Sequence, residues 1–144
     1  METDVFTNYE PVKGIRSYGC GYLSFSFKYT KNEKGQDLDP VLHVTMHYAG
    51  EGEFKDRDLL LTFEGVITMR WNPDIYSTLD INSLSEVRAS GSTGALRYST
   101  NSFYLKKYTE TYPHMGEGCV NYFICGEEDL LELIALPNAK AEWI

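Results

Sequence analysis

The sequence predicts a mainly β fold: an antiparallel sheet, sandwich or barrel-like arrangement with one or two short helices. Apolar and polar residues alternate through several stretches of the chain, as the two faces of a half-buried strand require. Turn residues recur between these stretches, which is typical of an antiparallel sandwich or barrel. The 144 residues show no repeat, low-complexity tract or linker, and this length is common for one domain. We therefore expect a single domain that spans residues 1–144.

Two strands are expected in the first third of the chain. In the first, which starts at Gly21, one face holds Leu23, Phe25, Phe27 and Tyr29. A polar loop with turn residues around Gly35 follows. The second strand begins after Pro40, and its apolar face holds Leu42, Val44, Met46 and Tyr48. Its opposite face holds Val41, His43, Thr45 and His47.

The strongest alternation runs from Leu59 to Trp71, where every odd position is apolar except Gly65. A strand of this length is unusual, and glycine inside a strand often marks a bend. We expect the chain to bend at Gly65 so that the two halves serve two different sheets.

The remaining elements are shorter. Ser83 and Glu86 have the spacing of a helix capping box. Residues 101–111 fit a short helix capped by Asn101 or Ser102, and they fit a strand equally well. Strands are expected at residues 119–125, 130–136 and 139–144, with turns between them. The predicted core consists of Leu23, Phe25, Phe27, Leu42, Val44, Met46, Leu61, Phe63, Ile67 and Met69.

The charge of the chain narrows the classes of partner. Lysine and arginine number 13 and aspartate and glutamate 21, which gives a net charge of -8. Nucleic acids and anionic membranes are therefore disfavoured, because both are bound through basic residues. A basic protein partner is permitted, and a homo-oligomer is compatible with the sequence. The acidic N-terminus, the absence of a long apolar run and the odd number of cysteines lead us to expect a cytoplasmic protein.

No motif for catalysis, cofactor binding or metal binding is found. His43 and His47 are about 13 Å apart along a strand, too far to share one zinc ion. One of them is placed to act as a single acid or base beside a carboxylate. The sequence contains neither the P-loop pattern nor the nucleophile-elbow pattern. We expect Cys119 and Cys125 to be small buried apolar residues. The sequence favours a protein that is not an enzyme, with no cofactor.

Tyrosines suggest a binding surface, because the chain has 11 of them and tyrosine is enriched at interfaces. Several lie outside the core stripes and should be exposed in part, Tyr22 among them. The predicted surface combines aromatic, loop and acidic residues: Tyr104, Tyr108, Tyr112, His114, Glu127, Glu128 and Asp129. A second acidic cluster is expected to form either solvated turns or a docking surface for a basic partner. It consists of Glu51, Glu53, Asp56 and Asp58.

Two segments carry a resemblance. LLLTFEGVITMRW (residues 59–71) and VNYFICGEEDLLELIAL (residues 120–136) resemble the central strand and final hairpin of small bacterial proteins in the immunity-protein-like families associated with toxin systems. The resemblance implies an intracellular binding protein and assigns no residue a role.

Three functional hypotheses follow. The leading one is a non-catalytic binding protein, such as an immunity-type inhibitor, that masks a basic partner. The second is a small β-barrel that binds a hydrophobic small molecule, with Trp71 and Trp143 as pocket walls. The third is a hydrolase or isomerase that uses a histidine and a carboxylate. A flat acidic aromatic patch favours the first hypothesis, a large apolar cavity the second, and a buried histidine beside a carboxylate the third.

Overall fold

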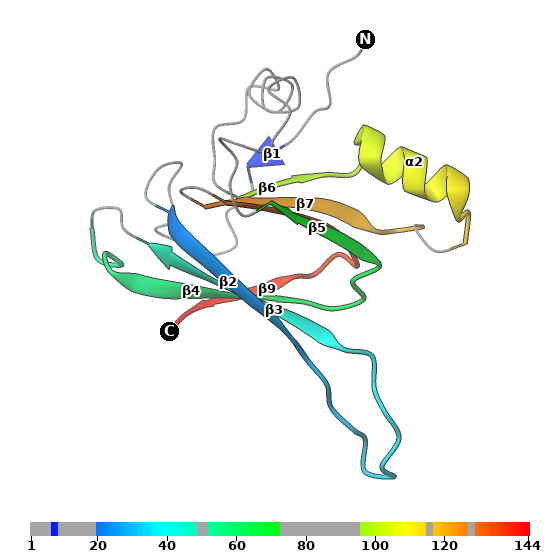
Figure 1. Cartoon of the computed structure of the whole chain (residues 1–144), viewed down its shortest axis with the longest axis horizontal. Helices are drawn as coiled ribbons and strands as arrows, with labels where there is room; N and C mark the ends of the chain where they lie inside the picture. Colours follow the sequence, from blue (N-terminus) through cyan, green and yellow to red (C-terminus); the bar gives the residue numbers. More distant parts are fainter. Residues whose placement is uncertain (1–6, 9–19, 49–51, 73–95, 115–116, 127–128) are drawn as a thin grey trace.

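The structure is a computed structural model that describes residues 7–8, 20–48, 52–72, 96–114, 117–126 and 129–144. Two antiparallel sheets lie face to face (Figure 1), so the predicted mainly β fold is confirmed. The five-stranded sheet has the order β1 (Thr7–Asn8), β6 (Leu96–Ser99), β7 (Val120–Cys125), β8 (Leu130–Ala135), β5 (Thr68–Asn72). The four-stranded sheet has the order β2 (Cys20–Lys28), β3 (Val41–Tyr48), β4 (Arg57–Phe63), β9 (Lys140–Trp143). One helix, α2 (Phe103–Thr111), belongs to the described residues.

The main core lies between the two sheets. Both sheets contribute alternate side chains to it, as in other sandwiches: Leu23, Leu42, Val44, Met46, Leu59, Leu61, Phe63, Leu96, Val120, Tyr122, Ile124, Leu131, Leu133 and Ala135. The rings of Phe63 and Tyr122 meet edge to face across the sheets, with their centroids 5.0 Å apart. Burying these side chains is the main source of the fold's stability.

The described strands form two open sheets and not a closed barrel. Trp71 contacts Phe25 on β2, whereas Trp143 belongs to β9. Because β2 and β9 are the opposite edges of the four-stranded sheet, the two tryptophans do not wall one pocket. The barrel with a tryptophan-lined pocket is therefore not the observed arrangement.

The predicted core is confirmed at most of its positions. Six of its residues are buried in the main core: Leu23, Leu42, Val44, Met46, Leu61 and Phe63. Phe25 and Met69 are partly buried against the same core. The prediction that Phe27 belongs to the core is wrong. Its side chain is 37% exposed, because the hairpin that carries it extends beyond the end of the five-stranded sheet (Figure 1). Ile67 packs in a different cluster, on the helix side of the five-stranded sheet.

The bend at Gly65 is confirmed. It separates β4 from β5, and these two strands belong to different sheets. Gly65 has a φ of +59°, and a Cβ there would come within 2.5 Å of the Leu136 side chain. Glycine is therefore required both by the backbone conformation and by the close packing of the β8–β9 connection.

Part of the second face of the five-stranded sheet is covered by α2. Leu105 of the helix packs with Cys119 and Ile134 in a second buried cluster. The helix begins after Ser102, whose hydroxyl accepts a hydrogen bond from the backbone N–H of Leu105. Of the alternatives at residues 101–111, the helix capped by Ser102 is correct and the strand is wrong. The predicted capping box at Ser83 and Glu86 lies outside the described residues.

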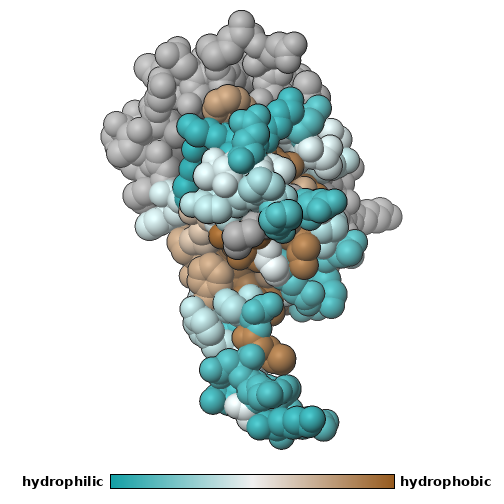
Figure 2. All heavy atoms as spheres, turned by 90° about the vertical axis from the view of Figure 1, so that its right-hand side faces the viewer, coloured by the Kyte–Doolittle hydropathy of each residue, from teal (hydrophilic) through white to brown (hydrophobic). Residues whose placement is uncertain are grey.

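The β2–β3 hairpin forms an arm, residues 27–41, that projects from the sandwich (Figure 1). At its tip the Asn32 side chain accepts hydrogen bonds from the backbone N–H groups of Lys34 and Gln36. Lys31 and Asp37 form an exposed ion pair across the arm. In Figure 2 the tip is hydrophilic, and hydrophobic atoms are exposed where the arm joins the body.

Within the described ranges, no helix combines the length and the apolar character needed to cross a membrane.

Candidate functional site

The four-stranded sheet has an outer face, which points away from the core and stays open among the described residues. The side chains on this face come from alternate positions of each strand and are half-buried or exposed. Strand pairing arranges them in rows, such as Ser26–His43–Thr62–Lys140 and Ser24–Thr45–Leu60–Glu142. The predicted division of β3 into an apolar face and a histidine-bearing face is confirmed.

One end of the outer face holds a group of interacting polar and aromatic side chains. We call it the His47 patch and define it as Tyr22, His47, Asp56 and Asp58. The Nδ1 atom of His47 lies 2.9 Å from a carboxylate oxygen of Asp58, and its Nε2 atom lies 3.8 Å from a carboxylate oxygen of Asp56. The Tyr22 ring stacks on the imidazole with a centroid distance of 5.5 Å and an interplanar angle of 5°. Tyr22 is 69% exposed, so the far side of its ring faces outward.

Strand pairing explains why these residues meet. His47 and Asp58 are directly opposite each other in the β3–β4 ladder, where opposed side chains are close enough to interact. An irregularity in β2 between Cys20 and Leu23 shifts the register next to Tyr22, and such bulges commonly redirect a side chain. Asp56 precedes β4 with a φ of +60°, a conformation that aspartate tolerates better than most residues.

The chemistry of the patch is that of an oriented histidine. An ionised carboxylate can only accept hydrogen bonds, so Nδ1–H of His47 donates to Asp58 and the ring orientation is fixed. General bases are oriented in a similar way. The patch, however, lies on the outer face of a sheet. A groove of about 620 Å³ lies beside α2 and is lined by Leu105, Cys119 and Val120 with seven other residues, none of them from the patch.

Metal binding is not suggested by the described residues. They contain no group of three or more His, Cys, Asp or Glu side chains placed to hold a metal ion. His43 and His47 share the outer face of β3 with Thr45 between them, which agrees with the spacing expected along a strand.

The predicted tyrosine surface is assembled only in part. Tyr104 and Tyr108 are half-buried, because both pack against the cluster under α2. Tyr112 and His114 are exposed at the end of the helix, and the Tyr112 ring lies 5.1 Å from that of Tyr108. Glu127 and Glu128 lie outside the described residues.

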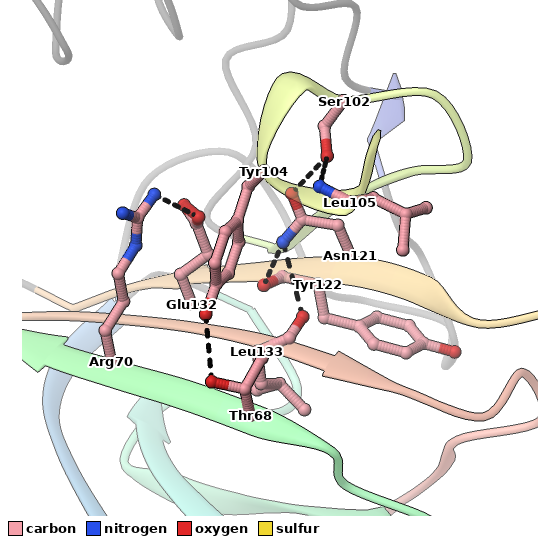
Figure 3. Close-up of polar contacts among 9 residues, drawn as sticks. All are labelled: Thr68, Arg70, Ser102, Tyr104, Leu105, Asn121, Tyr122, Glu132 and Leu133. Carbon is pink, nitrogen blue, oxygen red and sulfur yellow. Dashed lines mark hydrogen bonds and ion pairs between the residues drawn. The ribbon is translucent and has the colours of Figure 1, made fainter. Parts of the chain in front are cut away.

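The Tyr104 side chain contacts two residues of β5 in the five-stranded sheet (Figure 3). Its hydroxyl lies 3.2 Å from the Thr68 hydroxyl, and the Arg70 guanidinium lies 4.2 Å from the centre of its ring. Arg70 also forms an ion pair with Glu132, whose side chain is buried. Tyr104 therefore anchors the helix to β5, and its ring is not available as a docking surface.

A second anchor holds the start of the helix (Figure 3). The Ser102 hydroxyl donates a 2.7 Å hydrogen bond to the side-chain oxygen of Asn121, which is fully buried on β7. The Asn121 amide group donates in turn to the backbone carbonyls of Tyr122 and Leu133. These contacts satisfy buried polar groups and make α2 part of the rigid body of the fold.

Asp129 is wrongly predicted as a surface residue. It is 8% exposed, and its carboxylate accepts hydrogen bonds from the Trp71 indole, at 3.5 Å, and from the backbone N–H of Leu23. Burial raises the pKa of the Asp129 carboxyl above its ordinary value, and these hydrogen bonds oppose the rise. Because Leu23 and Trp71 belong to different sheets, Asp129 joins the edges of the sandwich.

Cys119 is a buried apolar residue, as the sequence predicts. It packs with Leu105 and Ile134, and burial raises the pKa of its thiol. A raised pKa lowers the thiolate fraction on which nucleophilic reactivity depends. Cys125 is only half-buried, so the prediction of a buried residue is wrong there.

The residues of the His47 patch were each recognised in the sequence, but their combination was missed. His47 was considered with His43, and Asp56 and Asp58 were considered as an acidic cluster. Alternation alone puts His47 on the outer face, whereas its pairing with Asp58 depends on the register of β3 against β4. The length of the β3–β4 turn is the signal that would have predicted this register.

The chain matches no protein-family model, and comparisons with curated proteins and with solved structures give no significant match.

Proposed function

We propose that this protein is a non-catalytic binding protein that presents the His47 patch to a basic partner protein. One observation carries the proposal: an exposed tyrosine ring stacks on a histidine held between two aspartates, on an open sheet face. Tyrosine is among the residues that dominate binding hot spots, since it buries a large area at a low cost in side-chain entropy. A ring whose orientation is already fixed loses even less entropy when a partner binds.

The charges on the outer face favour a basic group at the patch. The Asp56 and Asp58 side chains are 70% and 43% exposed, whereas Lys28 and Lys140 lie in rows closer to the arm. An arginine or lysine of the partner can stack on the Tyr22 ring and pair with these carboxylates.

The charge of the whole chain adds to this local effect. The net charge is -8, and opposite net charges accelerate the encounter of two proteins. The net charge of the chain and the carboxylates of the patch therefore favour the same class of partner, a basic protein.

The proposed mechanism is steric and electrostatic masking, without a cofactor. The partner's basic surface is covered by the outer face and is thereby blocked from its own target. The resemblance of residues 59–71 and 120–136 to immunity-protein-like families extends this proposal to an immunity-type inhibitor of a toxin.

The test is affinity capture with the full chain as bait, followed by washes at low and high salt. Wild type is compared with Tyr22→Ala and with Asp56→Asn/Asp58→Asn. Glu110→Gln, which removes an exposed charge on α2, is the matched control. A protein identified by mass spectrometry is then purified and its dissociation constant is measured by calorimetry.

We expect a basic protein that wild type and Glu110→Gln retain at low salt and that the patch variants lose. Tyr22→Ala should weaken binding by about 2 kcal/mol or more if the ring is a hot spot. High salt should weaken the complex because exposed charges are screened beyond about 8 Å at physiological ionic strength. Capture that is equal for wild type and the patch variants, or capture of no basic protein, contradicts the proposal.

A further inference from the structure

Strand β2 is an edge of the four-stranded sheet, and only part of that edge is covered. Among the described residues, β3 is the only strand that pairs with it. Near its start, Asp129 accepts a hydrogen bond from the Leu23 N–H. Gly126 packs there so closely that a Cβ would lie 2.8 Å from the Gly21 carbonyl oxygen. The β7–β8 turn thus covers the first half of the edge, and no described strand covers the second half, residues 25–29.

The direction of the backbone groups in this open segment follows from two backbone hydrogen bonds, one at the end of β3 and one across the arm. The Tyr48 carbonyl accepts a 2.8 Å hydrogen bond from the Asp56 N–H on the β4 side, so the odd-numbered residues of β3 face β2, and among them His43 pairs with Ser26. The Thr30 carbonyl accepts a 2.9 Å hydrogen bond from the Leu38 N–H across the arm, on the β3 side. Backbone groups alternate in direction along an antiparallel strand, and the β2–β3 register is unbroken from Leu23 to Lys28. The N–H and C=O groups of residues 25, 27 and 29 therefore point outward from the open edge.

Exposed aromatic side chains line the same segment. Phe27 is 37% exposed and Tyr29 is 76% exposed. The Phe25 ring meets the Trp71 ring edge to face, with centroids 5.4 Å apart, and Trp71 remains 48% exposed. Natural edge strands are normally protected from pairing by proline, by an inward-pointing charge or by a covering segment. Residues 25–29 contain no proline, and their one charged residue, Lys28, lies on the outer-face side.

We propose that this segment pairs with the same segment of a second copy of the chain, antiparallel and about a two-fold axis at Phe27. In this register Phe27 lies opposite Phe27 of the second copy, and Phe25 lies opposite Tyr29. These residues carry the outward backbone groups, so each opposed pair exchanges two N–H···O=C hydrogen bonds. Lys28 lies opposite Ser26, so no like charges oppose each other.

The side chains favour a second copy over an unrelated strand. The open segment is self-complementary about Phe27, as an isologous interface requires, because aromatic residues oppose aromatic residues and Lys28 opposes Ser26. Opposed side chains lie on the same face of a sheet. Tyr29 of the second copy therefore lies beside Phe25, on the side where Trp71 is exposed. One register covers the exposed rings of Phe27, Tyr29 and Trp71 together.

The dimer does not use the His47 patch. Pairing at β2 continues the four-stranded sheet into that of the second copy, and both outer faces remain open. A chain that does not dimerise therefore leaves the proposed binding function untouched. Likewise, a chain that binds no basic partner leaves the proposed dimer untouched.

The first experiment is sedimentation of the full chain over a range of concentrations. We expect a monomer–dimer equilibrium for wild type. Phe27→Lys and Phe27→Glu should each be monomeric, because they place like charges opposite each other at the two-fold axis. An equal mixture of the two variants should form a dimer again. Phe103→Glu, which alters an exposed phenylalanine on α2, should dimerise like wild type.

The second experiment needs no variant and reads the register directly. Amide hydrogen exchange of wild type is compared at low and high protein concentration. Protection should rise with concentration at Phe25, Phe27 and Tyr29, and should not change at Ser24, Ser26 and Lys28, whose amides face β3. A wild-type protein that stays monomeric overturns the proposal. So does a dimer that both Phe27 variants retain, or one whose concentration-dependent protection lies elsewhere.

Discussion

The two sheets differ in how many of their faces are buried. In the five-stranded sheet every residue of β8 is buried, as are five of the six residues of β7. In the four-stranded sheet, β3 alternates strictly between buried and half-buried positions. The helix and its polar anchors cover part of the second face of the five-stranded sheet, whereas the described side chains on the equivalent face of the four-stranded sheet are half-buried or exposed.

Because of this difference, the residues that stabilise the fold and the residues available for binding lie in different parts of the molecule. A substitution on either face of β7 or β8 removes buried contacts, so both faces of these strands are constrained by packing. On the outer face of the four-stranded sheet a side chain can change at a low cost in folding free energy. Residues such as Tyr22 and His47 are therefore available for binding, and the following predictions test this division.

The largest expected effect is at Ile134, which is fully buried under α2. Ile134→Ala should lower the free energy of unfolding by about 2–5 kcal/mol, because it leaves a cavity between the helix and the sheet. Leu60→Ala, at a half-buried position on the outer face of the other sheet, should cost about 1 kcal/mol or less. Urea unfolding of both variants measures the contrast, and equal losses would show that the two outer faces are equally constrained.

Asn121 tests the polar part of the covered face. Asn121→Ala should destabilise the fold by about 2–3 kcal/mol, because it leaves the Ser102 hydroxyl and two backbone carbonyls without their buried partner. Asn101→Ala, at an exposed position beside the same helix, is the matched control and should cost under about 1 kcal/mol. Thermal and urea unfolding compare the two variants, and a loss for Asn121→Ala no larger than the control's would remove the anchor's assigned role.

A pH-dependent effect is expected where the two sheets meet at Asp129. Burial raises the pKa of this carboxyl in the folded state above the ordinary value of 3.8, so the folded protein binds the proton more tightly than the unfolded chain. The contribution of Asp129 to stability therefore increases as the pH falls through the raised pKa and levels off below 3.8.

Asp129→Asn removes this titration and isolates it from that of the other carboxyls. The unfolding free energy of wild type minus that of Asp129→Asn should rise as the pH is lowered from neutral toward 4. Asp37→Asn, on the exposed arm, serves as the control. A difference that stays constant or falls over this range would show that the buried carboxyl is not the group responsible.

The smallest effect on stability is expected at Tyr22. Tyr22→Ala removes an exposed ring from the outer face and should change the free energy of unfolding by about 0.5 kcal/mol or less, even though it should weaken partner binding by about 2 kcal/mol or more. Circular dichroism during thermal unfolding measures this change. If Tyr22→Ala lowered the free energy of unfolding as much as Ile134→Ala does, the patch would be required for folding. Stability and partner binding would then depend on the same residues.

Local sequence patterns predicted much of the fold. The alternation in residues 21–29 and 41–48 predicted β2 and β3 because side-chain direction along a strand is a local property. The bend at Gly65 was predictable for a similar reason, since glycine tolerates a backbone conformation that other residues avoid. The helix at Phe103–Thr111 remained open between helix and strand, because its apolar positions are too few to favour one period.

The candidate site was predictable only as separate parts. Alternation placed His47 opposite the core, but Asp58 reaches it through the register of two strands. Tyr104 and Asp129 were predicted to belong to a binding surface, because Tyr104 lies outside the core stripes and Asp129 lies in an acidic turn. In the structure, α2 packs Tyr104 against Arg70, and the β7–β8 turn brings Asp129 between the edges of the two sheets.

The sequence by itself therefore determined most of the strands, the bend and most of the core, but not β1 or β6, because the predicted elements follow from side-chain periodicity and backbone preference over a few residues. Only the tertiary structure decided which sheet each strand joins, which face receives the helix, and which tyrosines and carboxylates stay exposed. The physical reason is that burial and strand register depend on contacts between residues far apart in the chain, and a local pattern carries no information about which distant segment supplies them.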